Sequence, residues 1–230
     1  MNYVGTELEL FQHAVNWKRY WSAQVAPYVQ GKVLDVGCGL GVNAAYVVND
    51  RVTGYTFLEP DGSLLQQVGE HVQLPATITH RRIQGTTEQF KGEHFDTLLY
   101  IDVLEHIEYA AEELLRASDL LDTGGHLIIV APAFPFLYSP FDKAIGHYRR
   151  YTKRMLRDQI PATLQEERIR YLDSTGLALS LGNTLLLRQS APTLAQIAFW
   201  DTRIVSISRF TDIVVGFSFG RSLVAVYRKA

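Results

Sequence analysis

Two of the seven histidines, His106 and His147, lie where the surrounding residue types favour acid–base chemistry. His106 ends the Asp-Val-Leu-Glu-His string of residues 102–106, and His147 lies in a basic, tyrosine-containing segment. Because an imidazole titrates near neutral pH, either side chain could accept a proton from a reacting hydroxyl group. The alternative for the first site is that Glu105 and His106 open a helix and hold its loop by hydrogen bonds. We therefore predict His147 or His106 as a general base.

The segment around His147 also offers groups that could hold a substrate. The Gly-His-Tyr-Arg-Arg-Tyr-Thr string of residues 146–152 follows a proline-rich stretch that is too apolar for an ordinary exposed loop. Guanidinium groups placed there could hold a phosphate or a carboxylate of the substrate, whereas Lys153, Arg154 and Arg157 fit a solvated helix start. The predicted substrate-binding residues are Phe134, Tyr138, Asp142, Arg149 and Arg150.

A turn with three alternating glycines follows the first apolar run of the chain. Glycine lets the backbone turn tightly and approach a ligand where a Cβ atom would collide. Residue 42, where a nicotinamide-dinucleotide fingerprint has its third glycine, is valine, so that class of site is disfavoured. The acid Asp35 lies inside the apolar run and needs a partner, either a loop amide or the ammonium group of a ligand. The predicted ligand-binding residues of this turn are Asp35, Gly37, Cys38, Gly39 and Gly41.

A second apolar run, residues 52–58, ends on Glu59, eighteen positions after Gly41. An acid at the end of the second strand of such a unit can accept hydrogen bonds from both hydroxyls of a ribose. We therefore predict that Glu59 binds the sugar of a nucleoside.

Together, residues 33–41, Glu59 and residues 102–106 resemble the successive motifs of class I S-adenosylmethionine-dependent methyltransferases. The resemblance implies S-adenosylmethionine as cofactor, S-adenosylhomocysteine as product and no metal, with Asp102 and Val103 close to the cofactor. Many family members carry an acid for the adenine amine after the third strand. This chain has Thr86 in that region, whose hydroxyl could take the same hydrogen bond.

The acceptor of the methyl group is less well marked. The Gly-His-x-Arg-Arg-Tyr-Thr string resembles a bacterial subgroup associated with glycosyltransferase pathways, which implies a sugar-linked, lipid-linked or other small-molecule acceptor. We expect methylation at oxygen, with one of the two histidines as base. Two alternatives stay open. The basic segment could clamp RNA for modification, or the chain could bind the nucleoside without catalysis and dock a partner through its apolar segment.

Composition sets further limits. With 230 residues, 47% of them hydrophobic, the chain can bury one sizeable core, so we expect a single domain over residues 1–230. A net charge of −2 gives no general attraction to nucleic acid or to anionic membranes. The single cysteine, Cys38, excludes an intramolecular disulfide and is predicted to be a small filler of the loop. Because we find neither a secretory signal nor a membrane span, we expect a cytoplasmic protein.

Strand and helix patterns alternate along most of the chain. Apolar runs predict strands at 32–36, 52–58, 77–84, 97–101, 126–131, 167–171 and 222–227. Helical patterns are found at 7–28, from 41, from 61, at 109–121 and from 152. This alternation, with the resemblance, predicts an α/β fold: a doubly wound, Rossmann-like, seven-stranded, mostly parallel sheet with the last strand antiparallel, plus a helical and loop cap.

The regular alternation is interrupted at residues 132–151 and 176–218. We expect an N-terminal helix within residues 1–30. Both interruptions should lie beside the cofactor edge of the sheet and build the acceptor pocket. The apolar 176–218 segment should close over the acceptor or pair two subunits as a homodimer.

Overall fold

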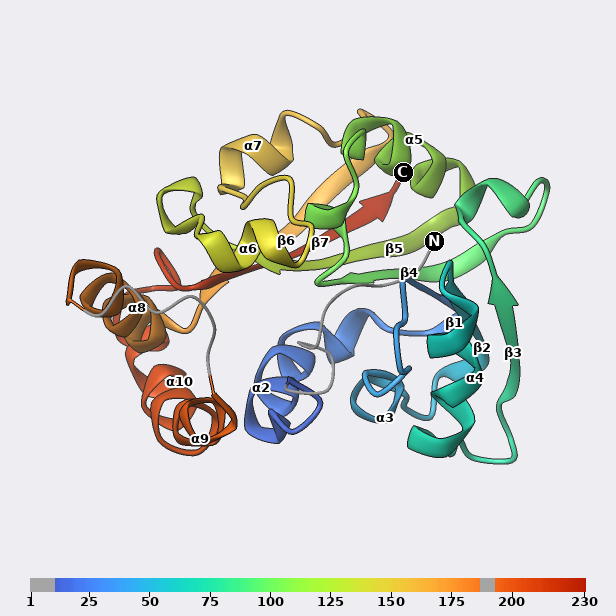
Figure 1. The fold of residues 1–230 in the computed structure, drawn as a ribbon. Helices are drawn as coiled ribbons and strands as arrows, with labels where there is room; N and C mark the ends of the chain where they lie inside the picture. Colours follow the sequence, from blue (N-terminus) through green and yellow to red (C-terminus); the bar gives the residue numbers. More distant parts are fainter. Residues whose placement is uncertain (1–10, 187–192) are drawn as a thin grey trace.

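The computed structural model describes residues 11–186 and 193–230, and it shows one seven-stranded sheet with helices on both faces (Figure 1). The strands are β1 (Gly31–Val36), β2 (Val52–Glu59), β3 (Thr79–Gln84), β4 (Phe95–Ile101), β5 (Leu121–Pro132), β6 (Leu164–Leu172) and β7 (Ser222–Lys229). Their order is β3-β2-β1-β4-β5-β7-β6; β7 runs antiparallel to both neighbours, and the pairs from β3 to β5 are parallel. The predicted α/β fold, with its antiparallel last strand, is confirmed.

The central strands are continuously apolar because helices cover both of their faces. Along β1, Val33 packs into one core and Leu34 into the other, and both side chains are completely buried. Leu99 and Leu98 of β4 divide between the same two cores. Because successive side chains of a strand point to opposite faces of the sheet, each strand packs against both helical layers.

Nine α-helices are assigned among the described residues, and they divide between the two faces. They are α2 (Val15–Val25), α3 (Ala44–Val47), α4 (Gly62–His71), α5 (Ala110–Leu120), α6 (Pro140–Ala144), α7 (Lys153–Arg157), α8 (Ser174–Leu186), α9 (Leu194–Phe199) and α10 (Val205–Val214). Residues of α2, α3, α4 and α10 pack into one core, and residues of α5 and α7 into the other. Figure 1 shows these two groups below and above the sheet.

Three predicted boundaries are corrected. The predicted 7–28 helix is interrupted at residues 12–14, and α2 begins at Val15; residues 7–10 lie outside the described part of the chain. The helix expected from Gly41 begins at Ala44, because Gly41 is itself in a left-handed conformation with φ +72°. The fifth strand begins five residues earlier than predicted, because Leu121 already pairs with Phe95 of β4.

Two buried aspartates join the segment after β6 to the first helix. Asp201 lies in a π-helical turn between α9 and α10, and its carboxylate accepts the backbone N–H groups of Asn16 and Trp17 at 3.1 and 2.8 Å. Asp212 of α10 accepts a hydrogen bond from the Tyr20 hydroxyl at 2.7 Å. These bonds satisfy N–H groups at the start of α2 and fix the C-terminal helices beside it.

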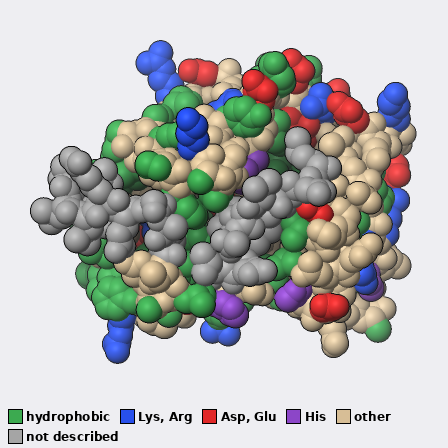
Figure 2. All heavy atoms as spheres, in the orientation of Figure 1, with side chains coloured by type: hydrophobic (Ala, Val, Ile, Leu, Met, Phe, Trp, Pro, Cys, Tyr) green, Lys and Arg blue, Asp and Glu red, His purple; other side chains and the backbone are tan. Residues whose placement is uncertain are grey.

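The described parts of segment 176–218, which was predicted to be apolar, are largely helical, and their outer face carries exposed hydrophobic side chains. Figure 2 shows hydrophobic side chains gathered over the part of the surface where these helices lie. Phe210 is 70% exposed and Val214 is 69% exposed. Within the described residues no helix is both long and apolar enough to cross a bilayer. Pairing of two subunits through this face stays a prediction.

Candidate functional site

The predicted cofactor residues come from loops at one edge of the sheet. Val36, near the end of β1, pairs with Leu58 of β2 and with Tyr100 of β4, so the three strands end at the same level. The glycine turn and Asp102 directly follow β1 and β4, and Glu59 is the last residue of β2. In parallel sheets this edge is where ligands bind.

The glycine turn fits closely against its neighbours. Gly37 has φ +62°, and a Cβ atom there would lie 2.9 Å from both Cγ atoms of Val103. Gly41 has φ +72°, and a Cβ atom there would lie 2.9 Å from Cγ1 of Val68. Val103, a predicted cofactor residue, therefore supports the turn directly, and any larger residue at Gly37 or Gly41 must displace the packing.

Glu59 braces the glycine turn with its carboxylate. Oε2 accepts the backbone N–H of Gly39 at 2.9 Å, and Oε1 accepts the backbone N–H of Asp61 at 3.0 Å. Burial raises the pKa of Glu59, while these two amide bonds act in the opposite direction. Since each carboxylate oxygen can accept two hydrogen bonds, both oxygens keep capacity for the hydroxyls of a ribose. The residues of this turn therefore fit a nucleoside.

Asp35, in β1 just before the turn, is 1% exposed. The partner described for it is the hydroxyl of Tyr55 on β2, which donates at 2.9 Å. Burial raises the pKa of Asp35 to about 7. Cys38 is also buried, and burial raises the pKa of its thiol, which agrees with the predicted filler role.

The two other predicted cofactor residues, Thr86 and Asp102, lie on different loops. Thr86 is exposed and precedes a short 3₁₀ turn, Thr87–Gln89, after β3. Asp102 adopts φ +55°, and its backbone N–H donates to the carbonyl of Val130 at 2.8 Å. Asp102 is exposed, and its side chain lines a cavity. Asp102 therefore joins the cofactor edge to that cavity.

The cavity has a volume of about 200 Å³ and lies between the sheet edge, α2 and α6. Its charged and titratable lining comprises Lys18, Asp102, Glu105, His106, Asp142, His147, Arg150 and Arg221. Its aromatic lining comprises Phe11, Trp17, Trp21, Phe141 and Trp200. Both predicted bases, His106 and His147, thus contact the same space.

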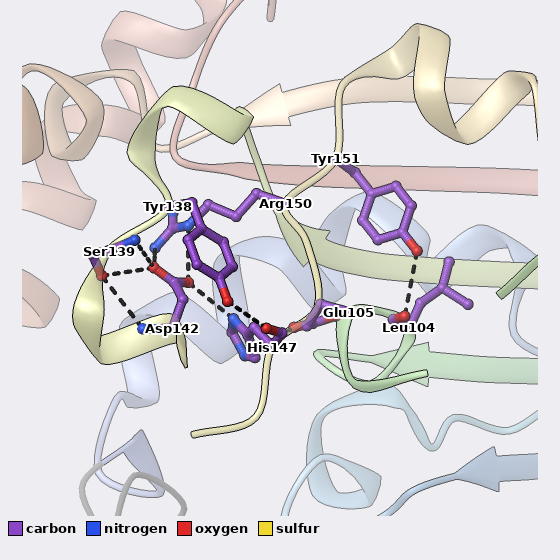
Figure 3. Close-up of polar contacts among 8 residues, drawn as sticks. All are labelled: Leu104, Glu105, Tyr138, Ser139, Asp142, His147, Arg150 and Tyr151. Carbon is purple, nitrogen blue, oxygen red and sulfur yellow. Dashed lines mark hydrogen bonds and ion pairs between the residues drawn. The ribbon is translucent and has the colours of Figure 1, made fainter. Parts of the chain in front are cut away.

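A buried carboxylate holds His147 in place (Figure 3). Asp142, 1% exposed, lies 2.9 Å from Nδ1 of His147 through its Oδ1. Arg150 donates to both Asp142 oxygens, at 2.9 and 3.0 Å, and the Ser139 hydroxyl donates at 2.7 Å. Burial opposes ionisation of Asp142, but the bonds from His147 and Arg150 keep its pKa well below the usual range. The guanidinium predicted to hold a substrate anion therefore binds a carboxylate of the protein.

Glu105 lies on the other side of His147. Its Oε1 is 3.8 Å from Nε2 of His147, and the residue is 0% exposed. Neither carboxylate oxygen of Glu105 has a hydrogen-bond partner among the described residues. Burial, reinforced by the charge of Asp102, raises the pKa of Glu105 well above its usual value. The Glu105 carboxylate does not hold the loop by hydrogen bonds, but its backbone carbonyl accepts the N–H of Tyr148 at 2.8 Å.

His106 stands edge-on to His147, with ring centroids 4.5 Å apart and planes at 83°. Burial, and then the charge of His147, lower the pKa of His106 to about 4. The alternative in which this segment opens the next helix is wrong, because residues Leu104–His106 form a separate 3₁₀ turn and α5 begins at Ala110.

Three predicted substrate residues lie outside the cavity lining. Arg149 donates to the carbonyl of Glu108. The Tyr138 hydroxyl donates to the carbonyl of His147 at 2.6 Å. Phe134 stacks on Tyr171, with ring centroids 4.6 Å apart. In this structure these side chains build the loop that carries His147.

Sequence reasoning missed Glu105, Lys18 and Arg221 as cavity residues. Lys18 is 6% exposed, and burial lowers its pKa to about 8. The sequence signal for a buried lysine was its place beside Trp17, on the side of α2 that packs into the core. Arg221 packs 5.3 Å over the ring of Trp200, and its position immediately before the last strand was the corresponding signal.

Comparison with known proteins gives a match over most of the chain. The sequence profile of the family described as "Methyltransferase domain" matches residues 13–183. This stretch contains the glycine turn, Glu59 and the whole His147 network.

Individual relatives are more distant. The chain is 30% identical over 133 residues to the ribosomal RNA small subunit methyltransferase C of Haemophilus ducreyi, covering 54% of this chain and 39% of that protein. It is 32% identical over 101 residues to the ubiquinone biosynthesis O-methyltransferase of Yersinia pestis, covering 42% of this chain and 40% of that protein. The chain thus spans about two fifths of the length of these relatives.

A solved structure shares the fold over nearly the whole chain. It is the N-methyltransferase NodS from Bradyrhizobium japonicum, in complex with S-adenosyl-L-homocysteine, with a TM-score of 0.56 and 13% identity. The match covers 95% of this chain and 87% of that one.

Proposed function

This chain belongs to the methyltransferase domain family, and from that premise we propose that it methylates a hydroxyl group of a small molecule bound in the cavity. The family membership makes it an S-adenosylmethionine-dependent methyltransferase domain. The acceptor, the reacting atom and the roles of individual residues are our proposals.

The glycine turn and Glu59 are proposed to hold the cofactor. When bound there, S-adenosylmethionine supplies a methyl group on a positively charged sulfur. Gly37 and Gly39 let the backbone approach the adenosyl group, and Glu59 accepts the ribose hydroxyls while it braces the turn. Asp102 lies between this turn and the cavity, where its carboxylate can meet a ligand ammonium group.

The observation that carries the proposal is the orientation of His147. Asp142 takes the Nδ1 side of the ring, so that Nε2 faces Glu105 beside the cavity. An imidazole fixed in this way can remove the proton of an acceptor hydroxyl, and such a base typically contributes about 10²–10⁴-fold to the rate. His106, in contact with the same cavity, is the second candidate.

The cavity lining supports an acceptor with a flat apolar part and an acidic group. Trp17, Trp21 and Phe141 offer ring surfaces, and Lys18 and Arg221 offer positive charge. The name of the ubiquinone-pathway relative supports oxygen as the methylated atom. The Gly-His-x-Arg-Arg-Tyr-Thr string keeps sugar-linked and lipid-linked acceptors among the candidates.

An RNA acceptor is the second candidate, favoured by the name of the ribosomal RNA relative. Two observations count against it. Arg150 and Arg149, the arginines of the predicted phosphate clamp, bond within the protein, and the net charge of the chain is −2. Binding to RNA should weaken steeply with added salt, so the absence of salt-dependent binding would exclude this candidate.

The test combines a binding assay with an acceptor screen. Calorimetry should detect S-adenosylmethionine, and a screen of phenols, hydroxy acids, sugar phosphates and RNA should release S-adenosylhomocysteine with a hydroxylated small molecule. His147→Asn should lower the turnover by about 10²–10⁴-fold and leave cofactor affinity unchanged.

The matched control is His126→Asn, a buried histidine beside Glu167 in the middle of β5 and outside the cavity lining, which should keep full turnover. No binding of the cofactor would overturn the proposed function. Equal turnover of the two variants would remove His147 from the chemistry.

A further inference from the structure

We propose that Glu105, His106 and His147 bind a divalent metal ion, and that this ion activates the hydroxyl of the acceptor. The inference departs from the expectation of a metal-free enzyme. It rests on the proposed function for the identity of the reaction; when the ion is bound, it takes over the activation of the hydroxyl that the proposed function gives to His147 in the metal-free site.

The first argument is the isolated carboxylate of Glu105. The residue is 0% exposed, and neither oxygen has a hydrogen-bond partner among the described residues. A buried ionised carboxylate without partners costs several kcal/mol. If the carboxyl is protonated instead, Nε2 of His147 lies 3.8 Å away, beyond hydrogen-bond distance, so this pair is also unsatisfied as it stands. The nearby guanidinium of Arg150 is bonded to both oxygens of Asp142, so Glu105 has no bonded cation among the described residues.

The second argument is the spacing of the three groups. One ligand atom from each of Glu105, His106 and His147 lies within 4.8 Å of the others, and the Glu105–His147 pair is 3.8 Å apart. Two ligands about 2.1 Å from a shared ion are separated by about 3 Å at a right angle and about 4.2 Å when opposite. Side-chain movements of less than about 1 Å would therefore complete the coordination.

The third argument is the support behind His147. Metal-binding histidines usually donate their outer ring N–H to a carboxylate, which fixes the ring and leaves the other nitrogen free. Asp142 has this relation to Nδ1 of His147 at 2.9 Å, and it is itself held by Arg150 and Ser139 (Figure 3). The free nitrogen, Nε2, faces Glu105.

Two imidazoles and one carboxylate form a ligand set that leaves coordination positions open. The three residues line the cavity, so these positions can take oxygen atoms of the acceptor. This favours acceptors with two adjacent oxygens, such as a catechol or a vicinal diol. A bound ion would lower the pKa of the acceptor hydroxyl, whose proton would pass to solvent; the oxygen would then bond to the methyl carbon while the carbon–sulfur electron pair goes to the sulfur.

The test is a titration of the chelator-treated protein with Co²⁺, whose visible absorption reports nitrogen ligation. We expect one Co²⁺ per chain. Glu105→Gln and His106→Asn should each weaken its binding by at least about 10-fold, and Asp142→Asn should weaken it by about 10–100-fold through the orientation of His147. Thermal melting of each variant reports whether it is folded. His126→Asn, from the separate His126–Glu167 pair, should bind Co²⁺ like the wild type.

The outcomes separate this inference from the proposed function, because calorimetry measures S-adenosylmethionine binding independently. Intact cofactor binding with no bound Co²⁺ would overturn the metal site alone. The same conclusion follows if folded His106→Asn binds Co²⁺ as tightly as the wild type, or if the chelated enzyme keeps full turnover. Co²⁺ binding without cofactor binding would overturn the proposed function and leave the metal site in place.

Discussion

Asp35, the buried acid of β1, should make the stability of the folded protein depend on pH. Asp35 is 1% exposed, and its described partner is the hydroxyl of Tyr55. Burial raises its pKa from 3.8 to about 7, so the folded protein keeps a proton that the unfolded chain releases between those values. Since the unfolded state binds fewer protons in this window, stability must fall as the pH rises through it. Replacement of Asp35 by asparagine removes this dependence.

The size of the effect follows from the two pKa values. Against an unfolded value of 3.8, a folded value of about 7 costs roughly 1.7 kcal/mol at pH 5 and roughly 4 kcal/mol at pH 8. The asparagine amide carries its own desolvation cost of about 1–3 kcal/mol, which is the same at both pH values. From pH 5 to pH 8, the stability of Asp35→Asn should therefore rise by about 2.5 kcal/mol relative to the wild type.

Thermal and urea unfolding at pH 5, 6, 7 and 8 and constant ionic strength would measure this difference. For a chain of this size, about 2.5 kcal/mol corresponds to about 5–10 °C in Tm. Tyr55→Phe is the matched control, because it removes the hydrogen bond and keeps the carboxyl, so its destabilisation should be larger at pH 8 than at pH 5. A difference between Asp35→Asn and wild type that stays constant across the range would refute the assigned burial cost.

Two further predictions concern the glycine turn. Glu59→Gln should lower the affinity for S-adenosylmethionine by about 10-fold in calorimetry, because a neutral amide replaces a charged acceptor that also holds Gly39; unchanged affinity would show that Glu59 only braces the turn. Cys38 should react with a thiol reagent at least about 100-fold more slowly in the folded protein than in urea, because its thiol is buried and its pKa is raised. Rapid labelling of the native protein would mean that the turn opens readily.

The cofactor edge of the fold could be predicted from the sequence because its signals are local. A buried parallel strand requires a continuous apolar run, and the turn after it requires glycine wherever φ is positive, as at Gly37 and Gly41. Glu59 follows from the length of one strand–helix–strand unit. Each of these features depends on residues that are neighbours in the chain or in adjacent strands, so their spacing carries the information.

The acceptor side could be predicted only as a set of residue types. Arg150 was expected to bind a substrate anion, but Asp142 takes both arms of its guanidinium. Glu105 and His147 are separated by 41 intervening residues and meet through the loop that carries α6. Sequence patterns show that a charge is present, but the partner of that charge is decided by tertiary packing, which has no local signal.

The cofactor half and the acceptor half of the site should tolerate substitution to different degrees. The cofactor half depends on backbone atoms of the glycine turn and on Glu59, whereas the acceptor half depends on side chains from α2, the α6 loop and the start of β7. The segment 102–106 belongs to both halves, since Val103 supports the turn while Glu105 and His106 line the cavity. Substitutions at Lys18 or Arg221 should therefore alter which acceptor is methylated without weakening cofactor binding. A substitution at Val103 should instead disturb the glycine turn through its contact with Gly37.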